Sequence, residues 1–262
     1  MSNGSGTKAA SQFAKLRWFN AVMCFLHLVQ GAAIVLLSND YSVTLTTSFL
    51  KWMPGIENLG TVTEGVVSLR LGPLIAAFLL ISAAAHFIMA SPIAFNWYVG
   101  NLKRKINYLR WYEYSLSASL MVAIIAMLSG VFDLPSLILL FTLTGMMNLF
   151  GLMMELHNQT TDKTNWTAYI FGCIAGIVPW VIIAWYFFAA ISSNTGTIPT
   201  FVYTILPTLF VFFFSFALNM ALQYKKVGPW RDYLFGETVY MILSLVAKSA
   251  LAWQVFAGTL AR

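Results

Sequence analysis

Seven long apolar stretches, nearly free of charged side chains, constrain the fold of this chain more than any other feature. They run over Phe19–Ser38, Val66–Ala90, Leu102–Ser129, Leu134–Leu156, Trp166–Ala190, Pro199–Tyr224 and Tyr233–Leu260. A helix of about 20 apolar residues spans the hydrocarbon core of a bilayer, so each stretch is long enough to cross it. Only 9% of the residues are charged. We therefore expect an all-α membrane protein built as a seven-helix bundle.

The rest of the chain leaves no room for a second domain. Residues 1–262 are expected to form one membrane domain, in which the Gly- and Ser-rich residues 1–11 are a disordered tail. In the loop of residues 39–65, Tyr41, Val43 and Leu45 alternate with polar residues, and Pro54 and Gly55 interrupt the run. This pattern predicts a β-hairpin outside the membrane, with an irregular loop as the alternative.

Basic residues are divided unevenly between the two ends of the predicted helices. Three lie at one end, namely Lys51, Arg70 and Arg262. Eleven lie at the other end: Lys8, Lys15, Arg17, Lys103, Arg104, Lys105, Arg110, Lys163, Lys225, Lys226 and Arg231. Because cytoplasmic loops carry the excess of Lys and Arg, we expect a multi-pass plasma-membrane protein with a cytoplasmic N-terminus and an extracellular C-terminus. The net charge of +6 therefore does not indicate nucleic-acid binding.

Lys248 lies in the middle of the last apolar stretch. A charged lysine at the bilayer centre costs about 2.5–3.5 kcal/mol on insertion scales, so it should be paired, neutralised or used covalently. An amine in an apolar pocket is well placed to form a Schiff base with a carbonyl compound. The alternative is a lysine whose ammonium group reaches the membrane surface.

Glu113 is the candidate partner of Lys248. If its helix begins near Leu102, Glu113 lies about 16 Å along it and reaches the depth of the lysine. If the helix begins at Tyr108, we expect Glu113 at the interface and no pairing. Arg110, three residues earlier, shares a helix face with Glu113 and either balances its charge or anchors the helix at the interface.

Further polar and aromatic residues complete the candidate site. His27 and Gln30 share a face of the first helix, and with His86 and Arg110 they predict a polar cavity that accepts a proton; the alternative is that the histidines only pack. The three histidines lie too far apart in sequence to predict a metal site. Aromatic residues such as Trp180 and Phe213 crowd the fifth and sixth stretches and offer flat walls to an extended apolar ligand, although lipid-facing phenylalanines are common.

Three local motifs resemble heliorhodopsins, a family of retinal-binding rhodopsins with inverted membrane topology. They are Ser244-Leu-Val-Ala-Lys248-Ser-Ala-Leu-Ala-Trp-Gln, Arg110-Trp-Tyr-Glu113-Tyr-Ser-Leu-Ser117 and Phe171-Gly-Cys-Ile-Ala-Gly-Ile-Val-Pro-Trp180. The resemblance covers essentially all seven helices. It implies that Lys248 carries all-trans retinal as a protonated Schiff base and that Glu113 is the counterion, which keeps the Schiff base protonated.

The resemblance also implies roles for the neighbouring residues. Ser117, Trp180 and Phe213 are expected to hold the retinal. Ser244 stands where ion-pumping rhodopsins have a second carboxylate, and Ile124 stands where proton pumps have an internal donor. His27 and His86 match the family's inner polar cavity.

These features favour a light-sensing photoreceptor without net ion pumping. The alternative is a light-gated or light-driven ion pathway, and a seven-helix transporter or receptor that does not bind retinal is a third reading. No ATP, metal or nucleotide motif indicates an enzyme. The resemblance further implies a homodimer in the lipid bilayer, while the sequence does not identify the signalling partner.

Overall fold

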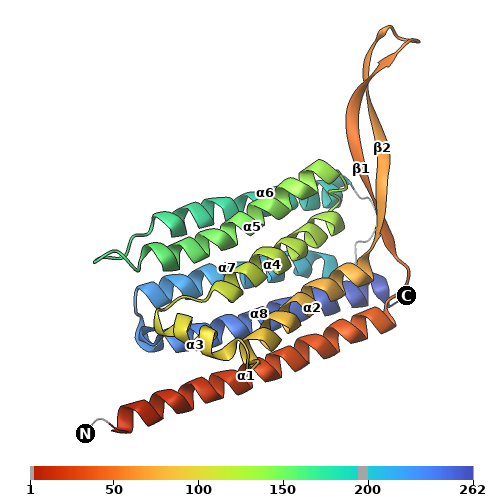
Figure 1. Ribbon diagram of the computed structural model, residues 1–262. Coiled ribbons are helices and arrows are strands. Elements are labelled where there is room, and N and C mark those ends of the chain that lie inside the picture. Colours follow the sequence, from red (N-terminus) through yellow and green to blue (C-terminus); the bar gives the residue numbers. More distant parts are fainter. Residues whose placement is uncertain (1–2, 194–199, 262) are drawn as a thin grey trace.

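The computed structural model describes residues 3–193 and 200–261 as a bundle of long helices that run side by side, with one protruding β-hairpin (Figure 1). The elements are α1 (Asn3–Leu37), β1 (Ser42–Met53), β2 (Asn58–Arg70), α2 (Leu71–Ala90), α3 (Phe95–Lys103), α4 (Tyr108–Leu128), α5 (Leu134–His157), α6 (Thr167–Ser193), α7 (Thr200–Tyr224), the short 3-10 helix η1 (Gly228–Arg231), α8 (Tyr233–Val255) and its π-helical extension η2 (Phe256–Leu260).

Seven helices in the described part of the chain are long and apolar enough to span a membrane, namely α1, α2, α4, α5, α6, α7 and α8. The shorter α3 lies between α2 and α4. The expected seven-helix architecture is therefore confirmed. The predicted start of the sixth stretch, Pro199, lies outside the described residues, and α7 is described from Thr200 onward.

The first helix is longer than predicted. Residues 1–2 lie outside the described part, but α1 is helical from Asn3 onward, so the prediction of a disordered tail over residues 1–11 is wrong from that point. Ala9, Ala10 and Ala14 have high helix propensity. Once the apolar part of the helix has formed, extending it through such residues needs no new nucleation.

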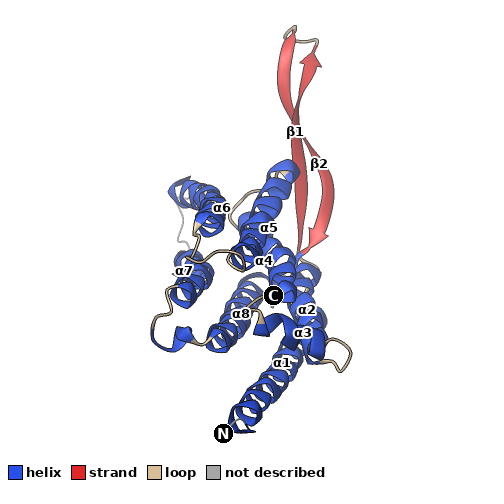
Figure 2. Ribbon diagram, turned by 60° about the vertical axis from the view of Figure 1, so that its left-hand side comes forward, coloured by secondary structure: helices blue, strands red, loops and turns tan. Residues whose placement is uncertain are grey.

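The predicted hairpin is present. Strands β1 and β2 pair in antiparallel register from Ser42–Arg70 to Met53–Asn58, with one irregularity between Leu45 and Thr46. The hairpin leaves the bundle at the end where the C-terminus lies and runs across the direction of the helices (Figures 1 and 2). It is longer than the predicted loop: β2 continues to Arg70, and α2 begins at Leu71 rather than Val66.

Packing at the base explains this extension of β2. Val43 and Leu45 are buried, and they pair with Leu69 and Val67 of β2. The backbone N–H of Thr46 also donates to the carbonyl oxygen of Phe132, in the connection between α4 and α5, at 2.8 Å. The base of the hairpin is therefore attached to the bundle through both its apolar residues and its backbone.

The third predicted span, Leu102–Ser129, is divided into two helices. Helix α3 ends at Lys103, Lys105 adopts a positive φ of 60°, and α4 begins at Tyr108. The side-chain oxygen of Asn107 accepts a hydrogen bond from the backbone N–H of Arg110 at 3.1 Å. An asparagine N-cap of this kind starts a new helix, which accounts for the break.

The bundle interior has two unlike halves. The half next to the hairpin, here called the apolar half, is filled by hydrophobic side chains that include Ile34, Leu71, Ile75, Phe78, Leu79, Ile124, Ile183, Leu209 and Leu251. The other half, here called the polar half, lies toward the N-terminus. Within the described ranges, the buried charged side chains all lie in the polar half: Arg110, Glu113, Glu155, Glu237 and Lys248.

Candidate functional site

Lys248 lies in the polar half, next to its boundary with the apolar half and about two thirds of the way along α8. Its side chain is buried, and Nζ donates to Oε1 of Glu113 at 3.0 Å and to Oγ of Ser244 at 2.8 Å. Ser244 lies one helical turn before Lys248, which places the two side chains on one face of α8. The structure therefore brings these three residues together, and Lys248 does not extend to the membrane surface.

Glu113 is buried although α4 begins at Tyr108. Glu113 lies only about 8 Å beyond that start, so the expectation that such a helix would leave it at the interface is wrong. The reason is that the bundle continues past the start of α4. Tyr98 and Leu102 of α3 are buried there in a cluster of apolar residues. Glu113 Oε1 also accepts a hydrogen bond from Oγ of Ser82 on α2 at 2.6 Å, a contact that sequence analysis did not predict.

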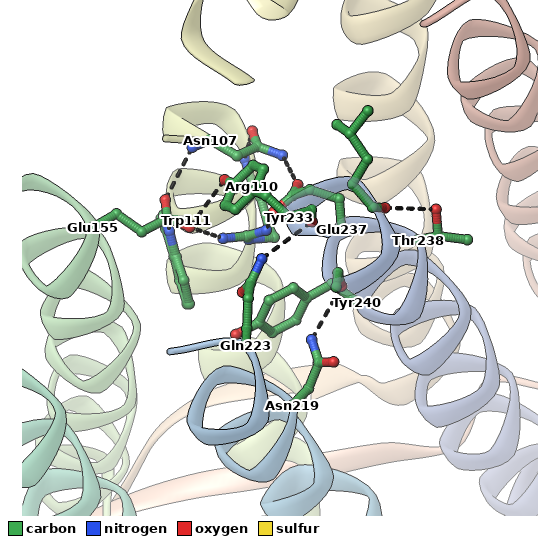
Figure 3. A network of polar contacts seen from close by, with 12 residues as sticks. Asn107, Arg110, Trp111, Glu155, Asn219, Gln223, Tyr233, Glu237, Thr238 and Tyr240 are labelled. Carbon is green, nitrogen blue, oxygen red and sulfur yellow. Dashed lines mark hydrogen bonds and ion pairs between the residues drawn. The ribbon is translucent and has the colours of Figure 1, made fainter. Parts of the chain in front are cut away.

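Arg110 does not bridge to Glu113 and is not an interfacial anchor. It is buried, and its guanidinium group pairs with Glu155 of α5 at 2.5 Å and with Glu237 of α8 (Figure 3). The guanidinium carbon also lies 4.5 Å from the ring centroid of Trp111 and 4.1 Å from that of Tyr240. Carboxylates from two other helices therefore replace the predicted partner on its own helix.

Glu155 and Glu237 were missed as candidates, although both lie inside predicted spans. An ionisable residue within a membrane span marks a functional or paired site by default, and this signal was available for both. With Arg110 they form what we call the triad. Glu155 accepts hydrogen bonds from Arg110, the Asn107 backbone at 3.0 Å, Trp111 at 2.7 Å and Tyr233 at 3.1 Å. Glu237 accepts from Arg110 and from the Asn107 side chain at 2.8 Å.

The two histidines meet as predicted from their positions. The rings of His27 and His86 stack with centroids 5.7 Å apart, and Nδ1 of His86 lies 2.8 Å from Oδ1 of Asn20. Neither ring nitrogen of His27 has a hydrogen-bond partner among the described residues. Gln30 is directed elsewhere, because its Oε1 accepts from Nε1 of Trp253 at 3.0 Å.

A small cavity of about 10 Å³ lies between His86, Glu113, Arg110 and Glu237, with room for about one water molecule. It is lined by Ala85, His86, Met89, Tyr98, Asn107, Arg110, Glu113, Tyr114, Glu237 and Met241. The counterion candidate Glu113, one histidine and part of the triad therefore border the same space. Arg110 lies in this predicted polar cavity, as the sequence analysis placed it, but with different partners.

A second cavity, of about 660 Å³, lies among α4, α5, α6, α7 and α8. Trp180 and Phe213 line it, and their rings meet edge to face with centroids 5.2 Å apart. Tyr114 joins this cavity to the lysine, because its ring also lies 5.0 Å from Nζ of Lys248. The size and the aromatic lining fit an elongated apolar ligand.

Ser117, one turn beyond Glu113 on α4, is fully buried. Its Oγ has no hydrogen-bond partner among the described residues. A buried polar atom without a partner, so close to the lysine and carboxylate pair, is a further feature that fits a ligand in this region.

A family model described as Heliorhodopsin matches residues 16–260. The chain belongs to the heliorhodopsin family. No curated protein matches the chain. The match spans all seven membrane helices and the hairpin, so this heliorhodopsin is a microbial rhodopsin and a multi-pass membrane protein. Membership in a rhodopsin family implies a retinal chromophore, and the buried lysine beside an aromatic cavity has the chemistry that retinal needs.

Proposed function

We propose that this heliorhodopsin is a light sensor that carries all-trans retinal on Lys248 and signals without net ion pumping. The observation that supports the proposal best is the buried Lys248–Glu113 pair beside the aromatic cavity. When bound as a protonated Schiff base, retinal supplies light absorption and isomerisation. Trp180, Phe213 and Ser117 are the further residues proposed to hold it.

The chain's own residues then control the charge at the Lys248 nitrogen. The Glu113 carboxylate favours the charged form of that nitrogen. Ser244 contributes a hydroxyl group and no charge, so Glu113 is the single counterion. Ser82 holds the Glu113 oxygen at 2.6 Å. Once the proton leaves the nitrogen, we propose that Glu113 or the His27–His86 pair receives it.

The apolar half supports the absence of pumping. Beyond Lys248 toward the hairpin, Ile124 and Leu251 are fully buried in a hydrophobic core. A proton or ion that crosses the bundle needs polar partners along its path, because the cost of a bare charge in such surroundings is high. We therefore propose that proton movement stays within the polar half, on the N-terminal side of the membrane, and does not cross the apolar half.

We further propose that the N-terminal end faces the cytoplasm of a plasma-membrane protein. Arg110 is paired inside the bundle, so ten basic residues, rather than eleven, support this orientation against three at the other end. A homodimer is proposed from the family resemblance. Chemical cross-linking in intact membranes tests it, and a purely monomeric product contradicts it. The signalling partner is proposed to bind the cytoplasmic side, and an enzymatic activity is not proposed.

The central test is an absorption spectrum after addition of all-trans retinal. The wild-type protein is expected to show a visible band, and Lys248→Ala is expected to lose it completely, because Lys248 is the only buried lysine among the described residues. Lys103→Ala, an exposed lysine on α3, is the matched control and keeps the band. A band that persists in Lys248→Ala removes the proposal.

Transport is tested separately. Illuminated liposomes that contain the protein are expected to show no sustained pH change or photocurrent, with or without a protonophore. A sustained light-dependent signal would instead establish an ion pathway.

A further inference from the structure

The buried charges of the polar half do not balance. Lys248 and Arg110 are cations, whereas Glu113, Glu155 and Glu237 are acids. Lys248 and Glu113 form a balanced pair, so the imbalance lies in the triad, where one guanidinium group faces two carboxyl groups. An uncompensated charge in a buried site is strongly unfavourable. One bound proton makes the triad neutral.

The hydrogen bonds indicate which carboxyl group holds this proton. Glu155 accepts four hydrogen bonds, from Arg110, Trp111, Tyr233 and the backbone of Asn107. Within the described part of the chain, Glu237 accepts two, from Arg110 and the Asn107 side chain. Donors aimed at a carboxylate favour its ionised form, so Glu155 is the better carboxylate and Glu237 the better acid.

The position of Glu237 links it to the candidate retinal site. It lines the same small cavity as Glu113 and His86. On α8, Ser244 and Lys248 follow it by seven and eleven residues, close to two and three helical turns, and therefore lie on its face of the helix. Nε of Arg110 and the hydroxyl group of Tyr240 are buried without hydrogen-bond partners among the described residues. Among the residues that line the small cavity, Glu113, Glu237 and His86 can exchange a proton through one water.

We propose that Glu237 is a proton-binding site that is occupied in the dark and that sets the charge of the cavity shared with Glu113. This inference rests on the proposed function, since it takes Glu113 as the counterion. When the O–H bond of Glu237 breaks, the proton passes to cavity water and leaves a second carboxylate near Glu113. The Lys248 nitrogen then lies near two negative charges instead of one.

Several titratable groups face Glu237 from the surrounding elements. They are Arg110, Glu113 and Tyr114 of α4, Glu155 of α5, His86 of α2, Tyr98 of α3, and Tyr233 and Tyr240 of α8 itself. Burial raises the pKa of Tyr98 to about 12, so this phenol stays neutral. Arg110 is the only cation among the groups in this set that are charged at neutral pH. Its guanidinium group pairs with Glu155 as well as with Glu237.

Infrared spectroscopy in the dark tests the occupancy. In ester-free detergent at neutral pH, a protonated carboxyl group gives a C=O stretching band that ionised carboxylates lack. Glu237→Asp and Glu155→Asp both preserve the charge count. We expect Glu237→Asp to shift this band, Glu237→Gln to remove it, and Glu155→Asp to leave it in place. A band that shifts only in Glu155→Asp, or no band in the wild type, overturns the proposal.

This infrared measurement needs neither retinal nor light, so its outcome is independent of the Lys248→Ala spectrum. The link to the chromophore has its own test, an alkaline titration of the visible band. The wild-type band is expected to shift to shorter wavelength as Glu237 loses its proton, because added negative charge stabilises the positive nitrogen. Glu237→Gln is expected to lack that shift. Identical titrations of the two proteins overturn the link.

Discussion

The two halves of the bundle solve the problem of membrane burial in opposite ways. The apolar half excludes charge and packs hydrocarbon against hydrocarbon around Ile124 and Leu251. The polar half buries five ionisable side chains and pairs them with one another through hydrogen bonds. Because a membrane interior supplies no water to correct a poor pairing, the polar half tolerates change only where the partners remain balanced.

This difference indicates in which half a proton released after illumination can be accepted. A displaced proton finds acceptors in the polar half, whereas the described core of the apolar half consists of hydrophobic side chains. The two halves also meet at Lys248, so the proposed chromophore site lies against a closed hydrophobic core on one side and a connected polar network on the other. Four substitutions break or sharpen this contrast.

Introducing an acid into the apolar half should have the largest effect. Ile124 is fully buried, and Ile124→Asp places a carboxyl group in a core cluster that is hydrophobic throughout its described residues. We expect a loss of more than about 4 kcal/mol in the free energy of unfolding, or no folded protein. Ile124→Val is the matched control and should cost about 0.5–1.5 kcal/mol. Thermal unfolding followed by tryptophan fluorescence measures both, and equal stability of the two variants would mean that this half accepts charge.

Removing the cation of the triad comes next. Arg110→Gln leaves Glu155 and Glu237 buried without it, and we expect a loss of about 3–5 kcal/mol. The double variant Arg110→Gln/Glu155→Gln should regain part of this loss, since one carboxyl group then remains and can hold a proton. Lys103→Gln on the surface of α3 serves as the control. The midpoints of thermal unfolding report all three, and an unchanged midpoint for Arg110→Gln would show that the triad does not stabilise the fold.

Neutralising the proposed counterion should change the visible absorption band more than it changes the free energy of unfolding. In Glu113→Gln the Lys248 nitrogen loses its nearest negative charge. We expect the visible band to move to longer wavelength, or to be lost at a lower pH than in the wild type, because the carboxylate no longer favours the protonated nitrogen. Absorption spectra across a pH series measure this. If spectrum and titration both stay as in the wild type, Glu113 is not the counterion.

The smallest effect is expected when the hydrogen bond from Ser82 to the proposed counterion Glu113 is removed. Ser82→Ala removes one hydrogen bond to Glu113, worth about 1.5–3 kcal/mol for a bond to a charged group, and leaves the carboxylate in place. The visible band should shift in the same direction as in Glu113→Gln but by less. Ser91→Ala is the control, because this half-buried serine just beyond α2 bonds to the backbone of Ile88 and Ala94 rather than to a carboxylate. A shift as large as that of Glu113→Gln would assign to Ser82 a role beyond support.

Much of the fold was predictable because membrane burial acts on long stretches. Seven apolar runs gave the seven spans, and the alternation at Tyr41, Val43 and Leu45 gave the hairpin. The boundaries were less predictable. Helix α1 continues to Asn3, β2 continues to Arg70, and α4 starts only at Tyr108. Each depends on local capping or on tertiary packing that a hydropathy pattern does not contain.

The candidate site also contains residues that were predictable from the sequence and residues that were not. The cost of a buried lysine pointed to Lys248, Glu113 was the candidate acid for it, and the family resemblance added Ser244. Helix arithmetic alone would have rejected the pair, because α4 begins at Tyr108. The partners of Arg110 were not, since proximity on one helix suggested Glu113 while tertiary structure supplied Glu155 and Glu237. Charged residues inside predicted spans were the available signal for Glu155 and Glu237. The excess of acid was not predictable, because the predicted spans also contain Arg70, Lys103, Arg104 and Lys105, and only the structure shows which charges are buried.

The hairpin offers a practical handle for experiments. Most of this small protein lies inside the bilayer or a detergent micelle, where it gives electron microscopy little to align. The turn at residues 54–57 projects away from the helices (Figure 2), and a side chain added at Gly55 would meet nothing within 4 Å. An epitope inserted there would present an antibody fragment outside the micelle, as a marker for image alignment that stands clear of the photochemistry.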